Sequence, residues 1–373
     1  MKRVLLITDI FPPDIGGPAT FMAALADALA AAGHRVGVIC RAERRAVNAG
    51  SNGLFQVWRL PRQAGRGAAL QVAGVIAAQA LRHDVVFSNG LEAQTELACR
   101  LTGRPYVLKV VGDLAWERAR LRALTKLSVD AFQQAPDSDS TVRSWIRRRQ
   151  AFARHARRVL VPSQYLRRLV TGWGVPAEQV FVVSNGVTLE DYAALAPRQR
   201  VGGVFNILYV GRLVNWKGVE HLLAAVAAMR GARLVIAGDG PDEPALRALA
   251  GQLEAPVEFC GPLAKNGVLA RLAEAHVLAL PSEYEGLSHT LLEACAAAVP
   301  CVASDRGGNP EVIEPGRSGL LVPYGEVGAL RQALERLQAD EDLRLTLAAG
   351  AKARSRHFDF GQTVAATMAH LVA

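Results

Sequence analysis

The sequence has no apolar run approaching the roughly 18 residues that a membrane-spanning helix requires. Its first apolar stretch, Met1–Asp9, is also too short for the core of a signal peptide, so it predicts a buried strand. The five cysteines are odd in number and lack the spacing of metal ligands, which fits a reducing compartment and core packing. We therefore expect a cytoplasmic protein.

Two common nucleotide-binding patterns are absent from the segment G-R-L-V-N-W-K-G at 211–218. It matches neither the G-x-G-x-x-G of dinucleotide oxidoreductases nor the G-x-x-x-x-G-K-[ST] of P-loop NTPases. Arg212 and Lys217 nevertheless follow an expected strand, at the edge where open α/β sheets bind ligands. Together these cations can neutralise a diphosphate without a metal. The alternative is that both are surface charges.

Acidic residues are scarce in the first half of the chain. Residues 1–190 contain 26 Lys+Arg and 14 Asp+Glu, whereas the remaining residues contain 17 and 20. The segment Arg143–Arg158 combines much of this excess with Trp145, Ile146 and Phe152. It predicts a helix that lies on an anionic membrane, peripherally on the inner face of the cell membrane, or binds an anionic acceptor. A solvated arginine-rich face is the other interpretation. Because no nucleic-acid module is recognisable, we expect no nucleic-acid partner.

Strands and helices alternate in both halves, and 373 residues suit two domains. This alternation predicts an α/β protein with two Rossmann-like, doubly wound domains. The Pro/Gly/Arg-rich residues 193–203 are the expected linker. The strands are expected at residues 4–8, 35–40, 84–88, 106–110, 158–161, 179–183, 206–210, 233–237, 256–259, 277–280 and 299–303.

Two carboxylates, Glu285 and Glu293, flank the segment E-G-L-S-H-T-L-L-E. The apolar run before it predicts a strand, and the pattern becomes helical from about Ser288. The N–H groups at the start of that helix form a natural phosphate site. Glu293 can accept hydrogen bonds from sugar hydroxyls, since a carboxylate is an acceptor-only group. The alternative is that both glutamates are solvated.

Several motifs occur in an order that resembles the retaining family-4 glycosyltransferases of bacterial glycan and polysaccharide biosynthesis. Beyond G-R-L-V-N-W-K-G they are L-V-I-A-G-D-G-P (234–241), F-C-G-P-L (259–263), P-S-E-Y-E-G-L-S-H-T-L-L-E-A (281–294), G-G-N-P-E-V-I (307–313) and S-G-L-L-V-P (318–323). Upstream, P-P-D-I-G-G-P, G-H-R-V and S-N-G-V are similar to the family's N-terminal pattern.

This resemblance implies a GT-B fold, with two Rossmann-like domains that face a central cleft. The N-terminal domain, 1–195, would bind the acceptor, and the domain at 204–355 would bind a nucleotide-sugar donor. A C-terminal helix at 356–373 would pack back on the N-terminal domain. Enzymes of the family typically retain anomeric configuration and need no metal. The resemblance therefore implies no metal and no cofactor besides the donor substrate.

The resemblance also implies roles for individual residues. Glu293 would bind the donor ribose, and Arg212 and Lys217 would hold the diphosphate. Glu285 would contact the donor sugar and phosphate, together with the backbone of Gly286, Leu287 and Ser288. Gly16 and Gly17 would approach the donor or acceptor from the N-terminal side.

One position departs from the family pattern. Many relatives have a His-Asp pair after the strand at 106–110, where this sequence has Gly112 and Asp113. A histidine-based role is therefore in doubt, but Asp113 could orient a donor hydroxyl or the acceptor. The expected catalytic residues are Asp113, Arg212, Lys217 and Glu285.

The sequence thus predicts a glycosyltransferase that uses a UDP- or GDP-linked sugar. Its acceptor would be a hydroxyl of a glycan, including a lipid-linked one. Two alternatives remain open: another GT-B enzyme, such as a sugar-nucleotide epimerase, and a nucleotide-sugar-binding partner subunit without turnover.

Overall fold

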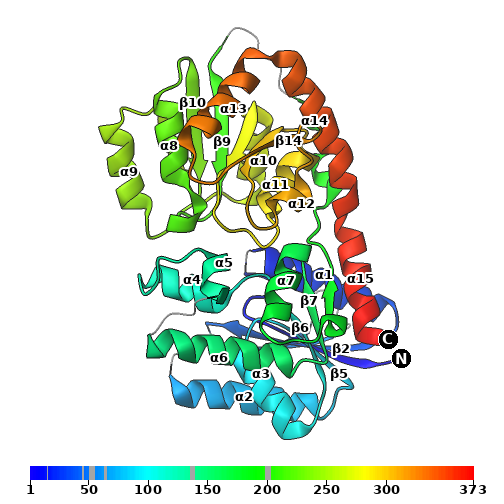
Figure 1. Ribbon diagram of the computed structural model, residues 1–373. Coiled ribbons are helices and arrows are strands. Elements are labelled where there is room, and N and C mark those ends of the chain that lie inside the picture. The colour runs from blue at the N-terminus through cyan, green and yellow to red at the C-terminus, as the bar shows by residue number, and fades with distance from the viewer. Residues whose placement is uncertain (15, 44–45, 50–54, 63–64, 135–138, 198–202) are drawn as a thin grey trace. The chain divides into compact units, whose positions relative to one another are not determined.

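Two sheets organise the chain in the computed structural model, which describes residues 1–14, 16–43, 46–49, 55–62, 65–134, 139–197 and 203–373 (Figure 1). By their internal contacts the residues form two units. Unit 1 comprises Met1–Ala119, Phe132–Val183 and Gln362–Ala373, and unit 2 comprises Arg120–Ala131 and Ser184–Gly361. These units differ from the expected ranges 1–195 and 204–355, because short segments of the sequence group with the other half.

Unit 1 is built on a sheet with the strand order β3-β4-β2-β1-β5-β6-β7-β8. Neighbouring strands are parallel except for the antiparallel pair β3–β4. The chain winds outward from β1 and then returns to place β5 on the other side of β1, so the winding direction reverses between these two strands. The strands are β1 (Arg3–Thr8), β2 (Arg35–Ala42), β3 (Ala46–Ala49), β4 (Gln56–Pro61), β5 (Val85–Asn89), β6 (Tyr106–Lys109), β7 (Arg158–Val161) and β8 (Val180–Val182).

Apolar residues at helical spacing attach the helices of unit 1 to its sheet. In α1, Met22, Leu25, Ala26 and Leu29 are fully buried, at the spacing of one helix face. Figure 1 shows α2, α3 and α6 as one layer beside the sheet. The helices lying wholly or partly in unit 1 are α1 (Gly17–Ala31), α2 (Arg66–Ala80), α3 (Glu92–Thr102), α4 (Leu114–Leu121), α5 (Val129–Gln134), α6 (Ser140–Arg154), α7 (Gln164–Gly172), η1 (Ala177–Gln179) and α15 (Phe360–Val372).

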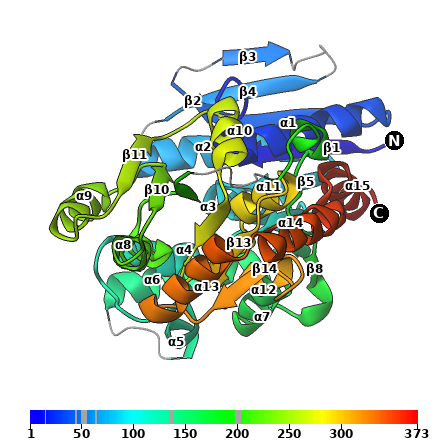
Figure 2. The same cartoon turned by 90° about the horizontal axis from the view of Figure 1, so that it is seen from above.

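The two ends of the chain meet in unit 1. The Lys2 ammonium donates to the backbone carbonyl of Ala373 at 2.8 Å, and the Arg158 guanidinium donates to the carbonyl of His370 at 2.6 Å. Helix α15 buries Val364 and Leu371. In Figure 2 the C-terminal end of α15 lies near the N-terminus. Residues 362–373 of the expected C-terminal helix therefore group with the N-terminal part of the sequence.

Unit 2 is built on a fully parallel sheet with the order β11-β10-β9-β12-β13-β14. Its winding direction reverses between β9 and β12. The strands are β9 (Phe205–Val210), β10 (Ala232–Ala237), β11 (Val257–Gly261), β12 (Val277–Leu280), β13 (Cys301–Ser304) and β14 (Gly319–Val322). The helices are η2 (Leu189–Tyr192), η3 (Asn215–Lys217), α8 (Val219–Ala227), α9 (Glu243–Gln252), α10 (Lys265–Glu274), α11 (His289–Ala296), α12 (Asn309–Val312), α13 (Val327–Ala339), α14 (Glu341–Ser355) and η4 (Arg356–Phe358).

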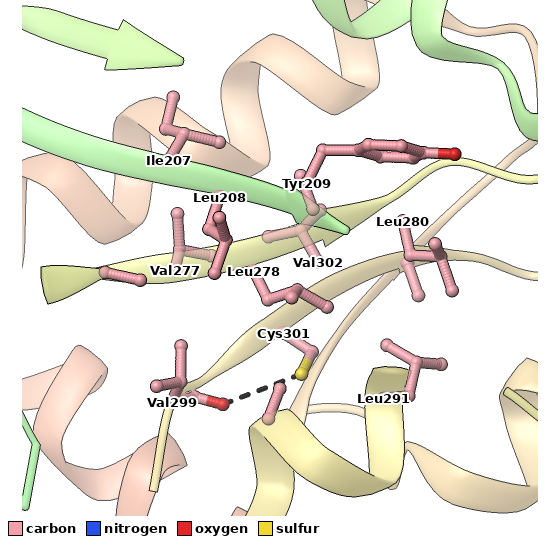
Figure 3. Packing of buried hydrophobic residues seen from close by; sticks show 14 of the residues in the cluster. Ile207, Leu208, Tyr209, Val277, Leu278, Leu280, Leu291, Val299, Cys301 and Val302 are labelled. Carbon is pink, nitrogen blue, oxygen red and sulfur yellow. Dashed lines mark hydrogen bonds between the residues drawn. The ribbon is translucent and has the colours of Figure 1, made fainter. Parts of the chain in front are cut away.

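The central strands of unit 2 are buried on both faces, as continuous apolar strands of a parallel sheet should be. Figure 3 shows Ile207 and Leu208 of β9 beside Val277 and Leu278 of β12, with Leu291 of α11 packed near the adjoining strand. All five side chains are at most 2% exposed. This packing fixes the start of α11 relative to the ends of β9 and β12. The predicted α/β class with two Rossmann-like, doubly wound sheets is confirmed.

Candidate functional site

The residues predicted to bind a ligand lie in loops at one edge of the unit 2 sheet. Arg212 and Lys217 follow β9, and the loop 281–288 follows β12, which is the neighbour of β9 in the sheet. Residues 305–308 follow β13, the next strand. Because the winding direction reverses between β9 and β12, this edge is where a doubly wound sheet forms a ligand crevice.

Lys217 and Glu285 form an ion pair that joins two of these loops. The Lys217 Nζ lies 2.6 Å from the Glu285 Oε1, and the side chains are 17% and 11% exposed. The Ser282 hydroxyl donates to the same carboxylate oxygen at 2.9 Å. An ammonium has three N–H donors, and Glu285 takes one of them. The pair therefore orients Lys217 and leaves donor capacity for an anionic ligand.

Arg212 lies on the same loop as Lys217. The Tyr209 hydroxyl donates to the backbone carbonyl of Arg212 at 3.1 Å, which holds the loop in place. The Arg212 side chain is exposed, and within the described part of the chain its guanidinium has no hydrogen-bond or ion-pair partner. An exposed guanidinium on a fixed backbone is suited to an incoming phosphate.

A residue that the sequence analysis missed also ties the two loops together. Arg120 Nη1 lies 2.9 Å from Glu283 Oε2 after β12, and its Nη2 donates to Asn215 Oδ1 after β9 at 3.2 Å. Burial raises the pKa of Glu283, and Arg120 opposes that rise. Glu283 N–H also donates to the Trp216 carbonyl at 2.7 Å. No motif pointed to Arg120, because it lies far from these loops in the sequence.

The loop after β13 packs directly on Glu285. The Gly308 N–H donates to the Glu285 carbonyl at 2.8 Å. A Cβ added to Gly307 would lie 2.5 Å from that oxygen, and one added to Gly308 would lie 2.3 Å from the Gly286 carbonyl. The two glycines of G-G-N-P-E-V-I therefore allow a close backbone approach that no side chain would permit.

The helix predicted from about Ser288 is confirmed. Ser288 caps α11, and its hydroxyl accepts from the Leu291 N–H at 3.3 Å. The preceding carbonyl, of Leu287, accepts from the buried Asn185 amide at 3.0 Å. The first N–H groups of a helix have no partner within the helix, and they attract anions. The structure therefore places a helix N-terminus beside Glu285.

Glu293 lies on α11 and is half-buried. Burial raises its pKa, whereas Lys265 and a hydrogen bond from the Tyr192 hydroxyl oppose that rise. Tyr192 itself is 2% exposed, and burial next to Glu293 raises its pKa as well. Burial and the hydrogen bond from Tyr192 therefore restrain the Glu293 carboxylate, which is not a free surface group. No motif in the sequence pointed to Tyr192 or Lys265.

Gly218 is needed directly after Lys217. It adopts φ +66°, and an added Cβ would lie 2.2 Å from the Pro281 carbonyl oxygen. Gly218→Ala should therefore lower the free energy of unfolding by at least about 1–3 kcal/mol, the cost of a strained backbone alone. Denaturant titration measures this change. Gly251→Ala, in helix α9 with nothing near the added Cβ, should instead raise stability by up to about 1 kcal/mol. Equal effects at both positions would contradict the structural explanation.

In unit 1, Asp113 is fully buried, and other groups of the protein bind both of its carboxylate oxygens. One carboxylate oxygen accepts from the N–H groups of Ala115 and Trp116, both at 3.1 Å. The other accepts from the Gln133 amide at 2.9 Å and pairs with Arg149. These contacts hold the start of α4, so the geometry gives Asp113 a structural role, and its catalytic role stays a prediction.

The predicted glycines of unit 1 lie at the start of α1. Gly16 is the residue before the helix, with φ +150°, and its carbonyl accepts from the Thr20 N–H at 3.1 Å. Gly17 is the first helical residue and is exposed. Their contact with a donor or acceptor stays a prediction.

Residues 143–154 of the basic segment lie in helix α6, where Trp145 and Phe152 are half-buried. Val142 and Ile146 are buried, while Arg143, Arg147 and Arg148 are exposed. The exposed side is therefore cationic, and membrane association stays a prediction. In the described ranges no helix is both long and apolar enough to cross a bilayer. Nor do the described residues include a group of three His, Cys, Asp or Glu side chains placed to hold a metal ion.

Known proteins similar to this chain fall into one class. The description "Glycosyltransferase Family 4" matches residues 15–191, and "Glycosyl transferases group 1" matches residues 204–340. The chain is 36% identical over 151 residues to an alpha-D-kanosaminyltransferase of Streptomyces kanamyceticus, covering 39% of each protein. It is 32% identical over 211 residues to a GDP-mannose-dependent alpha-(1-6)-phosphatidylinositol monomannoside mannosyltransferase of Mycobacterium tuberculosis, covering 51% of this chain and 54% of that protein. The chain thus spans about half the length of such relatives, or less.

Solved structures resemble the chain over its whole length. Sucrose-phosphate synthase from Thermosynechococcus elongatus has a TM-score of 0.81 at 21% identity, covering 99% of this chain and 98% of that one. Anabaena HepE in complex with UDP and glucose has a TM-score of 0.79 at 21% identity and covers both chains completely. At this identity the likeness concerns the fold. The two matching family descriptions account for most of the sequence, and the chain belongs to the family 4, group 1 glycosyltransferases.

Proposed function

We propose that the protein transfers a sugar, with retention of anomeric configuration, from a nucleotide-diphosphate sugar to a hydroxyl of a glycan acceptor. The Lys217–Glu285 pair carries this proposal. It lies at the crevice-forming edge of the unit 2 sheet, on the same loops as Arg212 and the start of α11. This edge offers cations and helix N–H groups to an anion, and carboxylates to hydroxyl groups.

In this proposal, Arg212 and Lys217 bind the donor diphosphate. Negative charge grows on the diphosphate as the bond to the sugar breaks, and fixed cations stabilise it in a partly buried site. Two cations supply this charge without a metal. The leaving diphosphate helps to deprotonate the acceptor hydroxyl, which attacks from the same face and retains the configuration.

The two glutamates have separate roles in the proposal. Glu285 keeps Lys217 in position through the 2.6 Å ion pair and accepts hydrogen bonds from hydroxyl groups of the donor sugar. Glu293 accepts hydrogen bonds from both hydroxyl groups of the ribose, because a carboxylate offers two acceptor oxygens to a diol. The Tyr192 hydroxyl, which hydrogen-bonds to Glu293, orients this carboxylate.

The names of similar proteins support two bases and a lipid-linked acceptor. The mycobacterial relative is named as GDP-mannose-dependent with a phosphatidylinositol monomannoside acceptor, whereas an Anabaena HepE structure is a complex with UDP-glucose. We therefore propose guanosine or uridine as the base. A lipid-linked glycan fits the exposed arginines of α6.

A thermal-shift panel of UDP-, GDP-, ADP- and dTDP-sugars tests donor binding. A donor at about one hundred times its Kd should stabilise the protein by about 2.7 kcal/mol and raise the melting temperature by several degrees. Glu293→Ala should abolish this shift. Glu274→Ala, an exposed glutamate at the end of α10, should keep it.

The proposal fails if no nucleotide sugar shifts the melting temperature, or if Glu293→Ala retains the full shift. Transfer of the sugar to any glycan then separates an enzyme from a binding subunit. Donor binding with no transfer to any acceptor would favour the binding subunit.

A further inference from the structure

Unit 1 contains a second candidate site, a cavity of about 350 Å³. It lies at the carboxyl ends of β1, β5 and β6, where residues 8–10, 89–90 and 109–112 line it. The winding direction of this sheet reverses between β1 and β5, so the cavity occupies the position where a doubly wound sheet binds ligands. Its volume falls within the range of small-molecule sites.

Lys109 lies in this cavity without a counter-charge. It is the last residue of β6 and is 8% exposed. Its ammonium lies 3.9 Å from the centroid of the Phe21 ring, and within the described part of the chain it has no hydrogen-bond or ion-pair partner. Burial alone lowers its pKa to about 8. A buried charge without a partner is costly, and a ligand anion would relieve that cost.

The acidic groups of the cavity do not offset the burial of Lys109, since burial is the only cause of its lowered pKa. Asp9 and Glu92 are close enough that Asp9 raises the pKa of Glu92, and Arg118 opposes the rise at both carboxyls. Desolvation is the main cause of both raised pKa values, although Asp9 stays accessible to solvent. Arg149, which also lines the cavity, is paired with Asp113.

The cavity therefore has two chemically different parts. One part offers the carboxylate oxygens of Asp9 and Glu92, which accept hydrogen bonds from hydroxyl groups. The other part offers the unpaired ammonium of Lys109. A single compact cation suits one negative charge, and a second charge on the ligand would be repelled by the two carboxylates.

We propose that this cavity binds a polyhydroxylated ligand that carries one negatively charged oxyanion, with the anion on Lys109 and hydroxyl groups on Asp9 and Glu92. The oxyanion is a carboxylate, as in an acidic sugar, or a phosphodiester, as in a lipid-linked polyol. That this ligand is the sugar acceptor rests on the proposed function. The anion site itself does not.

Calorimetric titration of the full chain with four probes tests this inference. The charged probes are glucuronate and glycerophosphoinositol, and their neutral counterparts are glucose and myo-inositol. At least one charged probe should bind about tenfold to a hundredfold more tightly than its neutral counterpart, since hydrogen bonds to charged groups have that effect. The preferred charged probe identifies the source of the oxyanion.

Lys109→Met should abolish the preference for charge while retaining binding of the neutral probe. Lys126→Met, which changes an exposed lysine, should keep the preference. Equal binding of charged and neutral probes to the unmodified protein would overturn the inference, as would an unchanged preference in Lys109→Met.

Nucleotide-sugar binding measured on the same variants separates this inference from the proposed function. Lys109→Met should bind the donor as tightly as the unmodified protein, which also shows that the variant is folded. If donors bind and charged probes have no advantage, the anion site is wrong and the proposed function stands. If charged probes bind through Lys109 and no donor binds, the donor assignment is wrong.

Discussion

Replacement of Lys217 by alanine is expected to lower the rate of sugar transfer by about a hundredfold to a thousandfold. Lys217 is a partly buried cation held by Glu285 at 2.6 Å, beside the expected position of the leaving diphosphate. Removing one fixed group that stabilises charge in a transition state typically has an effect of this size. The measurement is kcat and kcat/KM with the nucleotide sugar that gives the largest thermal shift.

A second variant separates the chemistry from the folding of the loops. Lys217→Ala leaves the Glu285 carboxylate, which is 11% exposed, without its cation, so some stability should be lost as well. Lys217→Ala combined with Glu285→Gln removes both charges and should recover the melting temperature but not the rate. Arg233→Ala, at an exposed ion pair, should change neither. Transfer within threefold of the unmodified rate in Lys217→Ala would reject the assignment.

Lys109→Met is expected to make the unliganded protein more stable. The folded-state pKa of Lys109 is about 8, against the ordinary 10.5, and this gap corresponds to roughly 3 kcal/mol. Methionine has a similar length without the charge, so the variant should gain about 1–3 kcal/mol in free energy of unfolding at pH 7. Denaturant titration of both proteins measures the difference.

The difference in stability between Lys109→Met and the unmodified protein should depend on pH. Because the pKa is lowered on folding, the unfolded chain holds the Lys109 proton more tightly between pH 8 and 10.5. The free-energy cost of burying the charged Lys109 is fully present below pH 8 and disappears as the pH rises towards 10.5. The stability gap between the two proteins should therefore be constant below pH 8 and should close above it. A variant less stable than the unmodified protein at pH 7 would show that Lys109 serves the fold.

Local pattern was enough to predict most strands and the start of α11. The central strands are short apolar runs, and Ser288 is a favourable capping residue where the helical pattern begins. Strands β3, β4 and β14 were not predicted. β4 carries Arg59 among apolar residues, and β14 is a four-residue strand that begins with a glycine. Neither has a pattern that distinguishes it from a loop.

The candidate site was predictable only where its residues form motifs. Arg212, Lys217, Glu285 and Glu293 lie in segments with recognisable spacing, and the structure places them on loops at one sheet edge and on the adjoining helix. Arg120, Tyr192 and Lys109 could not be found this way. Arg120 contacts a residue 163 positions further along, and a single lysine at a strand end gives no hint that it lacks a partner. Such features depend on tertiary packing.

The division of the sequence between the two units has a practical consequence for experiments on fragments of this protein. The chain passes from one unit to the other at residues 119/120, 131/132, 183/184 and 361/362. A C-terminal fragment that begins at the linker would lack Arg120. The Glu283 carboxylate, which is 11% exposed, would then have lost its cation. The N-terminal fragment would lack residues 362–373, in which the carbonyls of Ala373 and His370 accept from Lys2 and Arg158. Neither unit is encoded by one continuous stretch of the gene. A chimera that exchanges halves between relatives must therefore also take residues 120–131 and 362–373 from the matching parent.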